Sequence, residues 1–504
     1  MMKRNLSVML AALLFLALLA ACGSGDSPSS GTSSEPSAAT NNQTSDTSGA
    51  SSAPAPQESQ KITMAHIQGE WSWPMLDAIV DEYKTISGNE VELIYVPADG
   101  MSTWMTTQFA ADTATDIIFD STAPVADFYK NGWTVDLKPY LEAPSAYTGD
   151  IWMNSFRDGA LDGVIDPNGT GAMLGLRTTS AMVNFYYNKD VFERFGIDTD
   201  STLSWTGVLE VAKKIKESDP NVIPISVQNS IGWNLTWIGN FMMEQLWYDV
   251  VPALDIVDVN GGLQQIEVAA GIKAGIINLG DQRMTDYFRF LKELSNYFNT
   301  GFNSASWEYE ALFNESQSAM TINGSWFPNQ AIQNELTVNY GTGPIPFVDS
   351  AISDKAENRV RKYSMGPGGV DMFVTTKAFN EGRGEAAIDF LQYFSDPNTG
   401  AKKVTEQLMW IPVVKGVDVP EAMKGITDYI GDEVEMVSWN ANVLGLTAEA
   451  NDRYHVMLAN FLDDDSITPE KMTQDFAKLY EEALDEAIAN HPEWGIDSVI
   501  AQFG

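Results

Sequence analysis

Two acidic residues follow predicted strands, at positions where α/β proteins carry binding or catalytic side chains. Glu70 follows a predicted strand over residues 61–66, in the loop Gln68-Gly69-Glu70-Trp71, and Asp120 ends a predicted buried strand over 116–119. Where strands and helices alternate, ligands lie at the carboxyl ends of the strands, so both carboxylates are expected at one sheet edge. Paired acids suit glycoside hydrolysis, but acids there also bind sugars by accepting hydrogen bonds from hydroxyls. The residues leave both interpretations open.

Other catalytic and metal-binding patterns are missing from the sequence. Its three histidines have no metal-ligand spacing, and no HExxH, GxSxG or P-loop motif occurs. We expect His66, in a predicted buried strand, to be a core residue. The segment 255–267 resembles a calcium loop, but Ile256 occupies its first ligand position, so the ligand set fails. The sequence therefore predicts no metal site and no cofactor. We expect a protein that is not an enzyme, with glycoside hydrolysis by the paired acids as the alternative.

The single cysteine, Cys22, closes an export signal. Two basic residues precede an apolar run from Val8 to Ala21, which is shorter than a membrane-spanning helix requires. The sequence Leu19-Ala20-Ala21-Cys22 resembles the bacterial lipobox, in which a peptidase cuts before the cysteine and the thiol carries diacylglycerol. We expect residues 1–21 to be a lipoprotein signal peptide and Cys22 to be lipidated. The alternative is an ordinary signal whose cysteine happens to fall at the cut.

Residues 22–60 have the composition of a disordered Ser/Pro/Thr-rich tether. From Gly23 to Gln60 there is no Val, Ile, Leu, Met or aromatic residue, so apolar burial cannot offset the entropy of ordering. A flexible chain of about 38 residues reaches roughly 30–40 Å. Anchor and tether predict a protein held on the outer face of a bacterial membrane. The long tether and cysteine-poor body favour a Gram-positive cell.

The composition of the chain limits the kinds of partner that the folded part, which follows the tether, can bind. A formal net charge of −38 excludes binding to nucleic acid through its phosphates and favours a soluble monomer. The body of about 440 residues exceeds one hydrophobic core and fits two or three domains. The chain also holds 14 Trp, 17 Tyr and 23 Phe, which suits sugar recognition because an indole stacks on the apolar face of a pyranose.

Apolar periodicity predicts alternating strands and helices along the body. Besides the strands already named, strands are expected over 91–96, 184–188 and 318–323. Helices are expected from Pro74 to Ser87 and over 101–111, 281–298, 385–394 and 469–490, with Ser204 or Thr206 capping one more. This alternation predicts an α/β fold with mostly parallel sheets.

Four stretches resemble one known family, the extracytoplasmic solute-binding proteins of carbohydrate ABC transporters, typified by maltose/maltodextrin-binding protein. Thr115–Pro139 is similar to the family's PDII…G…DLTP segment, and Tyr186–Ile197 to YYNKDLF…GI. Phe313–Trp326 resembles F…AMTINGPW, and Gly368–Leu391 resembles GG…A..FL. The stretches occur in order from about residue 62 to about residue 415, across nearly the whole folded body.

The resemblance implies a two-lobed, type II periplasmic-binding-protein-like fold, with a mostly parallel sheet in each lobe and the ligand in the cleft between them. The expected division is residues 61–178 plus 366–412 in lobe 1 and residues 179–365 plus 413–504 in lobe 2. Crossings between lobes are expected near Arg177–Ala181, Lys362–Gly368 and Ile411–Lys415. Closure would be hinge bending, with the closed form favoured by ligand contacts to both lobes.

The resemblance also implies site residues. Trp326 matches the family's sugar-stacking Trp, and Glu70 matches an acidic loop position that accepts sugar hydroxyls. Further ligand candidates, taken from their places in the sequence, are Trp71, Asp120, Trp233 in preference to Trp237, Asp371 and Trp439. Trp104, Trp133 and Trp410 are expected to pack in the core or on the surface.

Three departures from the family pattern put maltodextrin itself in doubt. Ser204–Val208 replaces Pro-x-Thr-Trp-x-Glu, Asp120 stands where maltose-binding protein has a Trp, and an acid before the YNK motif is replaced near Ala181. We expect a protein that captures a di- or oligosaccharide and delivers it to ABC transporter permease subunits. The alternatives are a cell-surface glycoside hydrolase and a surface lipoprotein without a transport role.

Overall fold

The structure is a computed structural model that describes most of the chain beyond the predicted tether. Contacts divide the chain into Met1–Gln57 and Glu58–Gly504, and every element described below belongs to the second unit. The described residues are 59–67, 72–120, 124–166, 170–180, 183–229, 234–257, 263, 265–304, 308–333, 335–356, 358, 363–364, 371–420, 423, 435–436 and 448–503.

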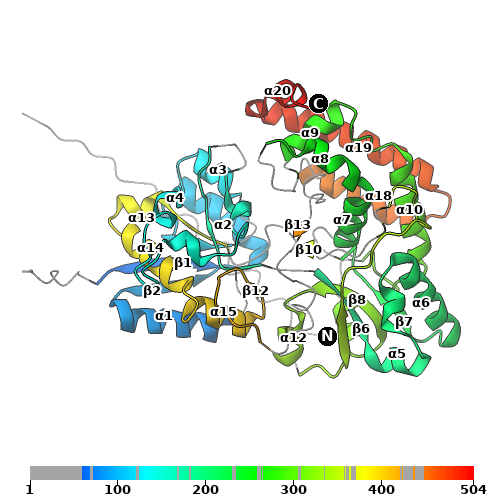
Figure 1. Ribbon diagram of the computed structural model, residues 1–504, viewed down its shortest axis with the longest axis horizontal. Helices are drawn as coiled ribbons and strands as arrows, with labels where there is room; N and C mark the ends of the chain where they lie inside the picture. The colour runs from blue at the N-terminus through cyan, green and yellow to red at the C-terminus, as the bar shows by residue number, and fades with distance from the viewer. Residues whose placement is uncertain are drawn as a thin grey trace, which may run out of the picture. The chain divides into compact units, whose positions relative to one another are not determined.

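A five-stranded sheet has the order β2-β1-β3-β11-β4. Its strands β1 and β2 are labelled in Figure 1. Its strands are β1 (Lys61–His66), β2 (Glu90–Tyr95), β3 (Ile117–Phe119), β4 (Leu176–Arg177) and β11 (Asp371–Val374). β1 is parallel to β2 and to β3, whereas β11 is antiparallel to both β3 and β4. A strand from late in the chain therefore completes a sheet that the early strands begin.

Helices cover both faces of this first sheet. On one face, α1 (Trp73–Ser87), α14 (Gly384–Phe394) and α15 (Gly400–Leu408) share a core with β1, β3 and β11. On the other face, α2 (Ala98–Ala110) and α3 (Val125–Lys130) pack against Ala65, Ile118 and Phe373. As predicted, α1 has Pro74 in its first turn and ends at Gly88, whose φ of 78° is left-handed and favours glycine.

A buried carboxylate holds the start of β3 in place. Asp116 is fully buried and accepts hydrogen bonds from the Thr63 backbone N–H of β1 at 2.8 Å and from Arg383 Nη2 at 2.7 Å. The hydrogen bond to Asp116 raises the Arg383 pKa above its ordinary value, and burial opposes this rise. Asp116 of the PDII-like stretch therefore ties β1, β3 and the start of α14 together rather than serving as a ligand.

A second, four-stranded sheet has the order β7-β8-β6-β9. Its strands are β6 (Val183–Asn188), β7 (Ile223–Ser226), β8 (Ser318–Gly324) and β9 (Tyr340–Gly343). β7 and β8 are parallel, but β6 is antiparallel to both β8 and β9. The expectation of a mostly parallel sheet is wrong here. All seven residues of β8 are buried although its sequence, SAMTING, mixes polar and apolar residues, so its pattern does not indicate the direction of its neighbours.

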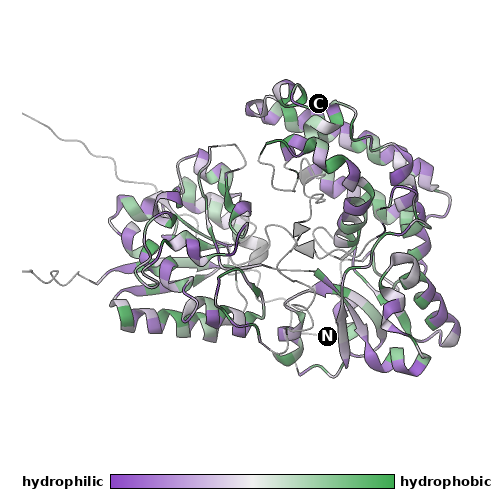
Figure 2. Cartoon of the chain, viewed as in Figure 1, coloured by the Kyte–Doolittle hydropathy of each residue, from purple (hydrophilic) through white to green (hydrophobic). Residues whose placement is uncertain are grey.

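The second sheet is also covered on both faces. One core joins β6, β7 and β8 to α6 (Trp205–Ser218), α7 (Asn234–Trp247), α10 (Gln282–Ser295), α18 (Ala448–Asp463) and α19 (Pro469–Asn490). A smaller cluster on the other face contains residues of α11 (Glu308–Asn314) and α12 (Phe327–Gln333). The outer helices, among them α5 (Lys189–Phe195), alternate hydrophobic and hydrophilic residues (Figure 2). Of the two predicted caps, Ser204 is the one that starts α6, by accepting from the Gly207 N–H.

Two pairs of short strands lie outside these sheets. β5 (Thr179–Ser180) pairs with β12 (Ile411–Pro412), which joins two of the three predicted crossing segments, and β10 (Tyr363–Ser364) pairs with β13 (Glu435–Met436). Val413 and Val414 pack in the core of the first sheet. The remaining helices are α4 (Lys138–Leu141), α8 (Val251–Leu254), α9 (Gln265–Lys273), α13 (Thr376–Asn380) and α20 (Ile496–Ile500). Among the described residues, no helix has the length and apolar content needed to span a bilayer.

Candidate functional site

The carboxyl edge of the first sheet gathers several polar and aromatic side chains. β1 and β2 end there at His66 and Tyr95, and β3 runs into Asp120. Because β11 runs in the opposite direction, it begins at this edge with Asp371, and the Asp120 backbone N–H donates to the Asp371 carbonyl at 3.0 Å. The structure thus brings together two predicted site residues, Asp120 and Asp371, that lie 251 positions apart in the sequence.

Arg177 pairs with Asp371 at this edge, and sequence reasoning did not single it out for a site role. Its Nε donates to Asp371 Oδ1 and its Nη2 to Oδ2, both at 2.7 Å. The two side chains are only 5% and 13% exposed. Burial disfavours the charged guanidinium, but the charge and hydrogen bonds of Asp371 more than offset this, so the Arg177 pKa is raised. A bidentate, shielded pair of this kind is strong and leaves little net charge at the edge.

Asp120 lies where it was predicted, but its carboxylate is shielded. The residue is 2% exposed, so a direct ligand contact requires local rearrangement. The alternative of helix capping does not apply to α3, whose N-cap is Pro124. His66 is also 2% exposed, which confirms the expected core histidine.

Trp326 follows the end of β8 and directly precedes α12. It is half-buried and packs against the core of the second sheet, with its ring edge-to-face with Trp237 at 6.0 Å and 71°. A Cβ added to Gly324 would lie 2.2 Å from Trp326 Cη2, so the indole occupies space that only glycine leaves free. Trp237 itself is 3% exposed and belongs to the core.

The family-like motifs around Trp326 fix its strand. The Tyr186 hydroxyl of β6 donates to the Gly324 carbonyl at 2.9 Å, and the Thr321 hydroxyl donates to the Ser226 carbonyl of β7 at 2.8 Å. The Asn188 side chain caps α5 by accepting from two N–H groups in its first turn. The YYNKD-like and TING-like residues therefore hold neighbouring strands together and position the residue that follows them.

Four of the predicted ligand residues, and the lipidation site Cys22, lie outside the described residues. The four are Glu70, Trp71, Trp233 and Trp439. All three tryptophans expected to pack do so. Trp133 stacks on Phe109 at 5.1 Å, and Trp410 lies against the first core. Trp104 packs in the cluster on the α2 face.

In the segment that resembles a calcium loop, the acidic residue at the far end binds backbone N–H groups near the start of the segment. Glu267 is fully buried, and its Oε1 accepts from the backbone N–H groups of Ile256 and Val257 at 2.7 and 2.8 Å. The middle of the loop, from 258 to 262, is outside the described residues. Within the described part of the chain, no group of three or more His, Cys, Asp and Glu side chains is placed to hold a metal ion.

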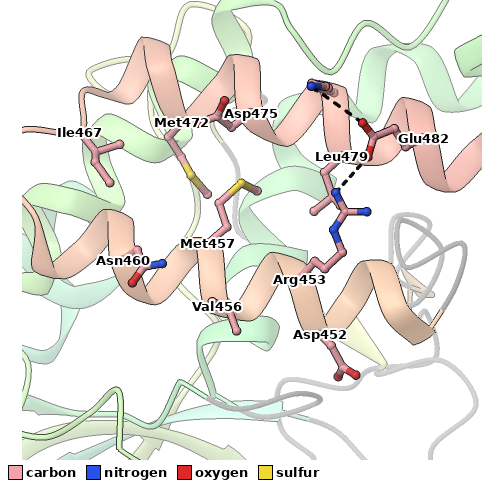
Figure 3. Close-up of a pocket in the computed structure, with 11 residues that line it drawn as sticks. Asp452, Arg453, Val456, Met457, Asn460, Ile467, Met472, Asp475, Leu479 and Glu482 are labelled. Atoms are coloured by element: carbon pink, nitrogen blue, oxygen red, sulfur yellow. Dashed lines mark hydrogen bonds and ion pairs between the residues drawn. The ribbon is translucent and has the colours of Figure 1, made fainter.

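One described pocket lies away from the sheet edges, between α18 and α19 (Figure 3). Its volume is about 630 Å³. Met457 and Met472 face each other across it, and at one end Arg453 is bonded to Glu482 at 2.9 Å (Figure 3). Apolar residues and charges of both signs line this pocket, so it shows no preference for a single ligand class.

The comparisons with known proteins agree with this architecture. A family model described as bacterial extracellular solute-binding protein matches residues 75–401. The sn-glycerol-3-phosphate-binding periplasmic protein UgpB of Rhizobium meliloti is 26% identical over 277 residues, 54% of this chain and 53% of that protein. An uncharacterized ABC transporter extracellular-binding protein of Pyrococcus horikoshii is 25% identical over 164 residues, 32% of this chain and 33% of its own length. The chain spans about half the length of the first of these curated relatives and less of the second.

Solved structures share the fold over most of both chains. The GacH receptor of Streptomyces glaucescens, solved unliganded and with acarbose, superposes with a TM-score of 0.62 at 16% identity, covering 85% of this chain and 100% of the receptor. A chitin oligosaccharide binding protein gives 0.62 at 19% identity, with coverage of 85% and 100%. Such identities show the fold alone, which is the type II periplasmic-binding-protein fold. With its matched motifs and two α/β sheets, the chain belongs to the bacterial extracellular solute-binding protein family.

Proposed function

We propose that this protein captures a neutral sugar, a di- or oligosaccharide, outside the cell and delivers it unchanged to the permease of an ABC transporter. The family and the fold are those of binding proteins. The observation that carries the ligand class is the pairing of Arg177 with Asp371 at the carboxyl edge of the first sheet.

A phosphate ester and a sugar make opposite demands on such an edge. A phosphate needs cationic or N–H donors that are not already neutralised. Here Arg177 is bound at both nitrogens by Asp371, and Asp120 adds a further acid beside the pair. A neutral sugar needs no uncompensated cation, and its hydroxyls can donate to the lone pairs of the Asp371 carboxylate that Arg177 leaves free. This charge arrangement, as far as the described residues extend, supports a neutral polyhydroxy ligand.

The second candidate ligand is sn-glycerol 3-phosphate. The names of the relatives in Rhizobium meliloti and Brucella favour it, because those proteins are described as binding that compound. The two candidates differ in charge and size, so a direct binding measurement separates them.

The binding experiment uses the full chain with Cys22→Ser, which prevents lipidation. Calorimetry and thermal unfolding would be measured with malto-, xylo- and chito-oligosaccharides, raffinose and sn-glycerol 3-phosphate. We expect one sugar to bind with micromolar or tighter affinity. At ~100 Kd it would stabilise the protein by about 2.7 kcal/mol. Binding of glycerol phosphate alone would overturn the sugar proposal, and hydrolysis of a bound sugar would favour the glycosidase alternative.

The same proposal places the protein on the outer face of a Gram-positive membrane, anchored by lipid at Cys22 through the tether 22–60. The proposed lobes are those expected from the sequence, residues 61–178 with 366–412 and residues 179–365 with 413–504, except that the second boundary moves past Val414, which packs in the core of the first sheet. The two lobes close around the sugar. Metabolic labelling with a palmitate analogue tests the anchor. Wild-type protein should be labelled and Cys22→Ser should not, and equal labelling of both would refute lipidation at this residue.

A further inference from the structure

We infer that Tyr95, supported by Trp73, is the outer stacking platform of the ligand site and selects for an oligosaccharide longer than its first bound ring. The inference rests on the proposed function and specifies the ligand length. Neither residue emerged as a candidate from the sequence. Tyr95 is the last residue of β2, and Trp73 is the first of α1.

Tyr95 is unusual among the aromatic residues of the described chain. The residue is 42% exposed, more than any other aromatic residue whose burial the structure describes. Large exposed apolar side chains elsewhere in these ranges are aliphatic, such as Ile86 and Val456. The residue therefore presents a flat apolar surface to solvent at the edge where α/β proteins bind their ligands.

Two neighbours hold the exposed ring. Trp73 meets it edge-to-face, with centroids 5.2 Å apart and planes at 62°, and His66 lies 5.8 Å away. Contacts on two sides restrict the rotamers of Tyr95 before any ligand arrives. A preordered ring loses little conformational entropy when a second flat surface stacks on it, which favours binding.

The position of β2 sets the length of ligand that can reach this ring. β2 is the outermost strand, and the sheet order places β1 between it and β3. Strands are spaced by about 4.8 Å, so Tyr95 lies roughly 10 Å along the edge from Asp120 and roughly 14 Å from Asp371. One pyranose ring held near the central acids does not cover this distance. A sugar that contacts both positions must contain further rings.

The geometry also favours a sugar over other flat ligands. The pair of Asp371 and Arg177 at the centre of the edge suits hydroxyl groups, and the tyrosine ring at its end suits the C–H face of a pyranose. The two features lie along one sheet edge, in the order in which an extended chain of rings would meet them.

The test compares oligosaccharides of increasing length in the full chain with Cys22→Ser. Calorimetry would use the malto-, xylo- or chito-oligosaccharide series that binds, from its shortest bound member to the four-unit member. Tyr95→Ala should weaken the four-unit sugar about 10- to 30-fold and the shortest bound member less than about twofold. Tyr95→Phe keeps the ring and should retain nearly full affinity for every length.

Two further variants keep the result interpretable. Ile86→Ala, at the opposite end of α1, removes a more exposed apolar side chain and should leave all affinities unchanged. If Tyr95→Ala does not fold, Tyr95→Leu keeps an apolar contact with Trp73 but removes the flat face. It should show the same length-dependent loss.

The outcomes separate this inference from the function on which it rests. If sugars bind and Tyr95→Ala binds every length as tightly as the unaltered chain, the outer platform is refuted while the sugar proposal stands. Equal losses at all lengths would also refute it, because Tyr95 would then act on the first ring or on the fold. If no sugar binds the unaltered chain, the proposed function fails and the platform fails with it.

Discussion

Replacing Trp326 by alanine should lower both the affinity for the ligand and the free energy of unfolding, and the burial and contacts of this residue set the expected size of each loss. A fully buried Trp loses roughly 3–5 kcal/mol of folding free energy on truncation to alanine. Trp326 is half-buried and meets Trp237 edge-to-face, so we expect a loss of about 1.5–2.5 kcal/mol, roughly half the full value. Loss of a stacking aromatic at the ligand should cost about 2–4 kcal/mol of binding free energy, or roughly 30- to 1,000-fold in affinity.

Gly324 supplies an independent way to move the same ring. A Cβ at this position would lie 2.2 Å from the indole, so Gly324→Ala must displace Trp326 without removing it. We expect a loss of affinity in the direction of Trp326→Ala, with Trp326→Phe intermediate because a smaller ring remains. The Gly324 variant thus tests the position of the indole rather than its presence.

The assay pairs urea unfolding without ligand and calorimetry with the sugar identified in the binding panel. Trp237→Phe serves as a control, since it alters a core Trp that is 3% exposed and should change stability more than affinity. Lowered stability with unchanged affinity in Trp326→Ala would place this residue in the core alone and refute the stacking role.

Two further predictions concern charge. Asp371→Leu leaves the Arg177 guanidinium buried and unpaired, so the free energy of unfolding should fall by about 3–5 kcal/mol. The double variant Asp371→Leu/Arg177→Met should recover most of this loss. If urea unfolding shows that the losses from the two single substitutions simply add in the double variant, the pairing is contradicted. Burial lowers the His455 pKa below its ordinary 6.5, so its contribution to stability is complete above pH 6.5 and is lost as the pH falls through the lowered folded-state value. His455→Gln should therefore flatten the fall in melting temperature below pH 6.5, and an unchanged pH profile would show that other groups cause it.

Local patterns were enough to predict eleven of the helices and strands that the structure describes: β1, β2, β3, β6, β8, α1, α2, α6, α10, α14 and α19. Pro74 and Gly88 mark the ends of α1, Ser204 caps α6, and the apolar stripe of α10 packs against the second sheet. These features depend on residues within a few positions of one another, so the sequence contains all the information they need. The resemblance of four motifs to a known family allowed the type II fold to be predicted as well.

The candidate site was only partly predictable. Asp120 was expected at a sheet edge and Asp371 after a crossover, but no sequence pattern indicated that Arg177 pairs with Asp371 or that Asp120 is 2% exposed. Tyr95 lies inside the predicted strand 91–96 and has no local pattern that distinguishes it from a core tyrosine. Its exposure depends on β2 being the edge strand of the sheet, and strand order is a property of long-range pairing.

The sequence alone was enough to predict an export signal, a tether, the alternating α/β elements and the family motifs, because each prediction depends on residue types close together in the chain. Tertiary structure alone decided strand order and direction, the insertion of β11 between β3 and β4, and the pairing of Arg177 with Asp371 across 194 positions. Pairing energies between distant segments depend on which backbones and charges meet in space. The short sequence patterns of buried strands do not specify which distant segments come into contact.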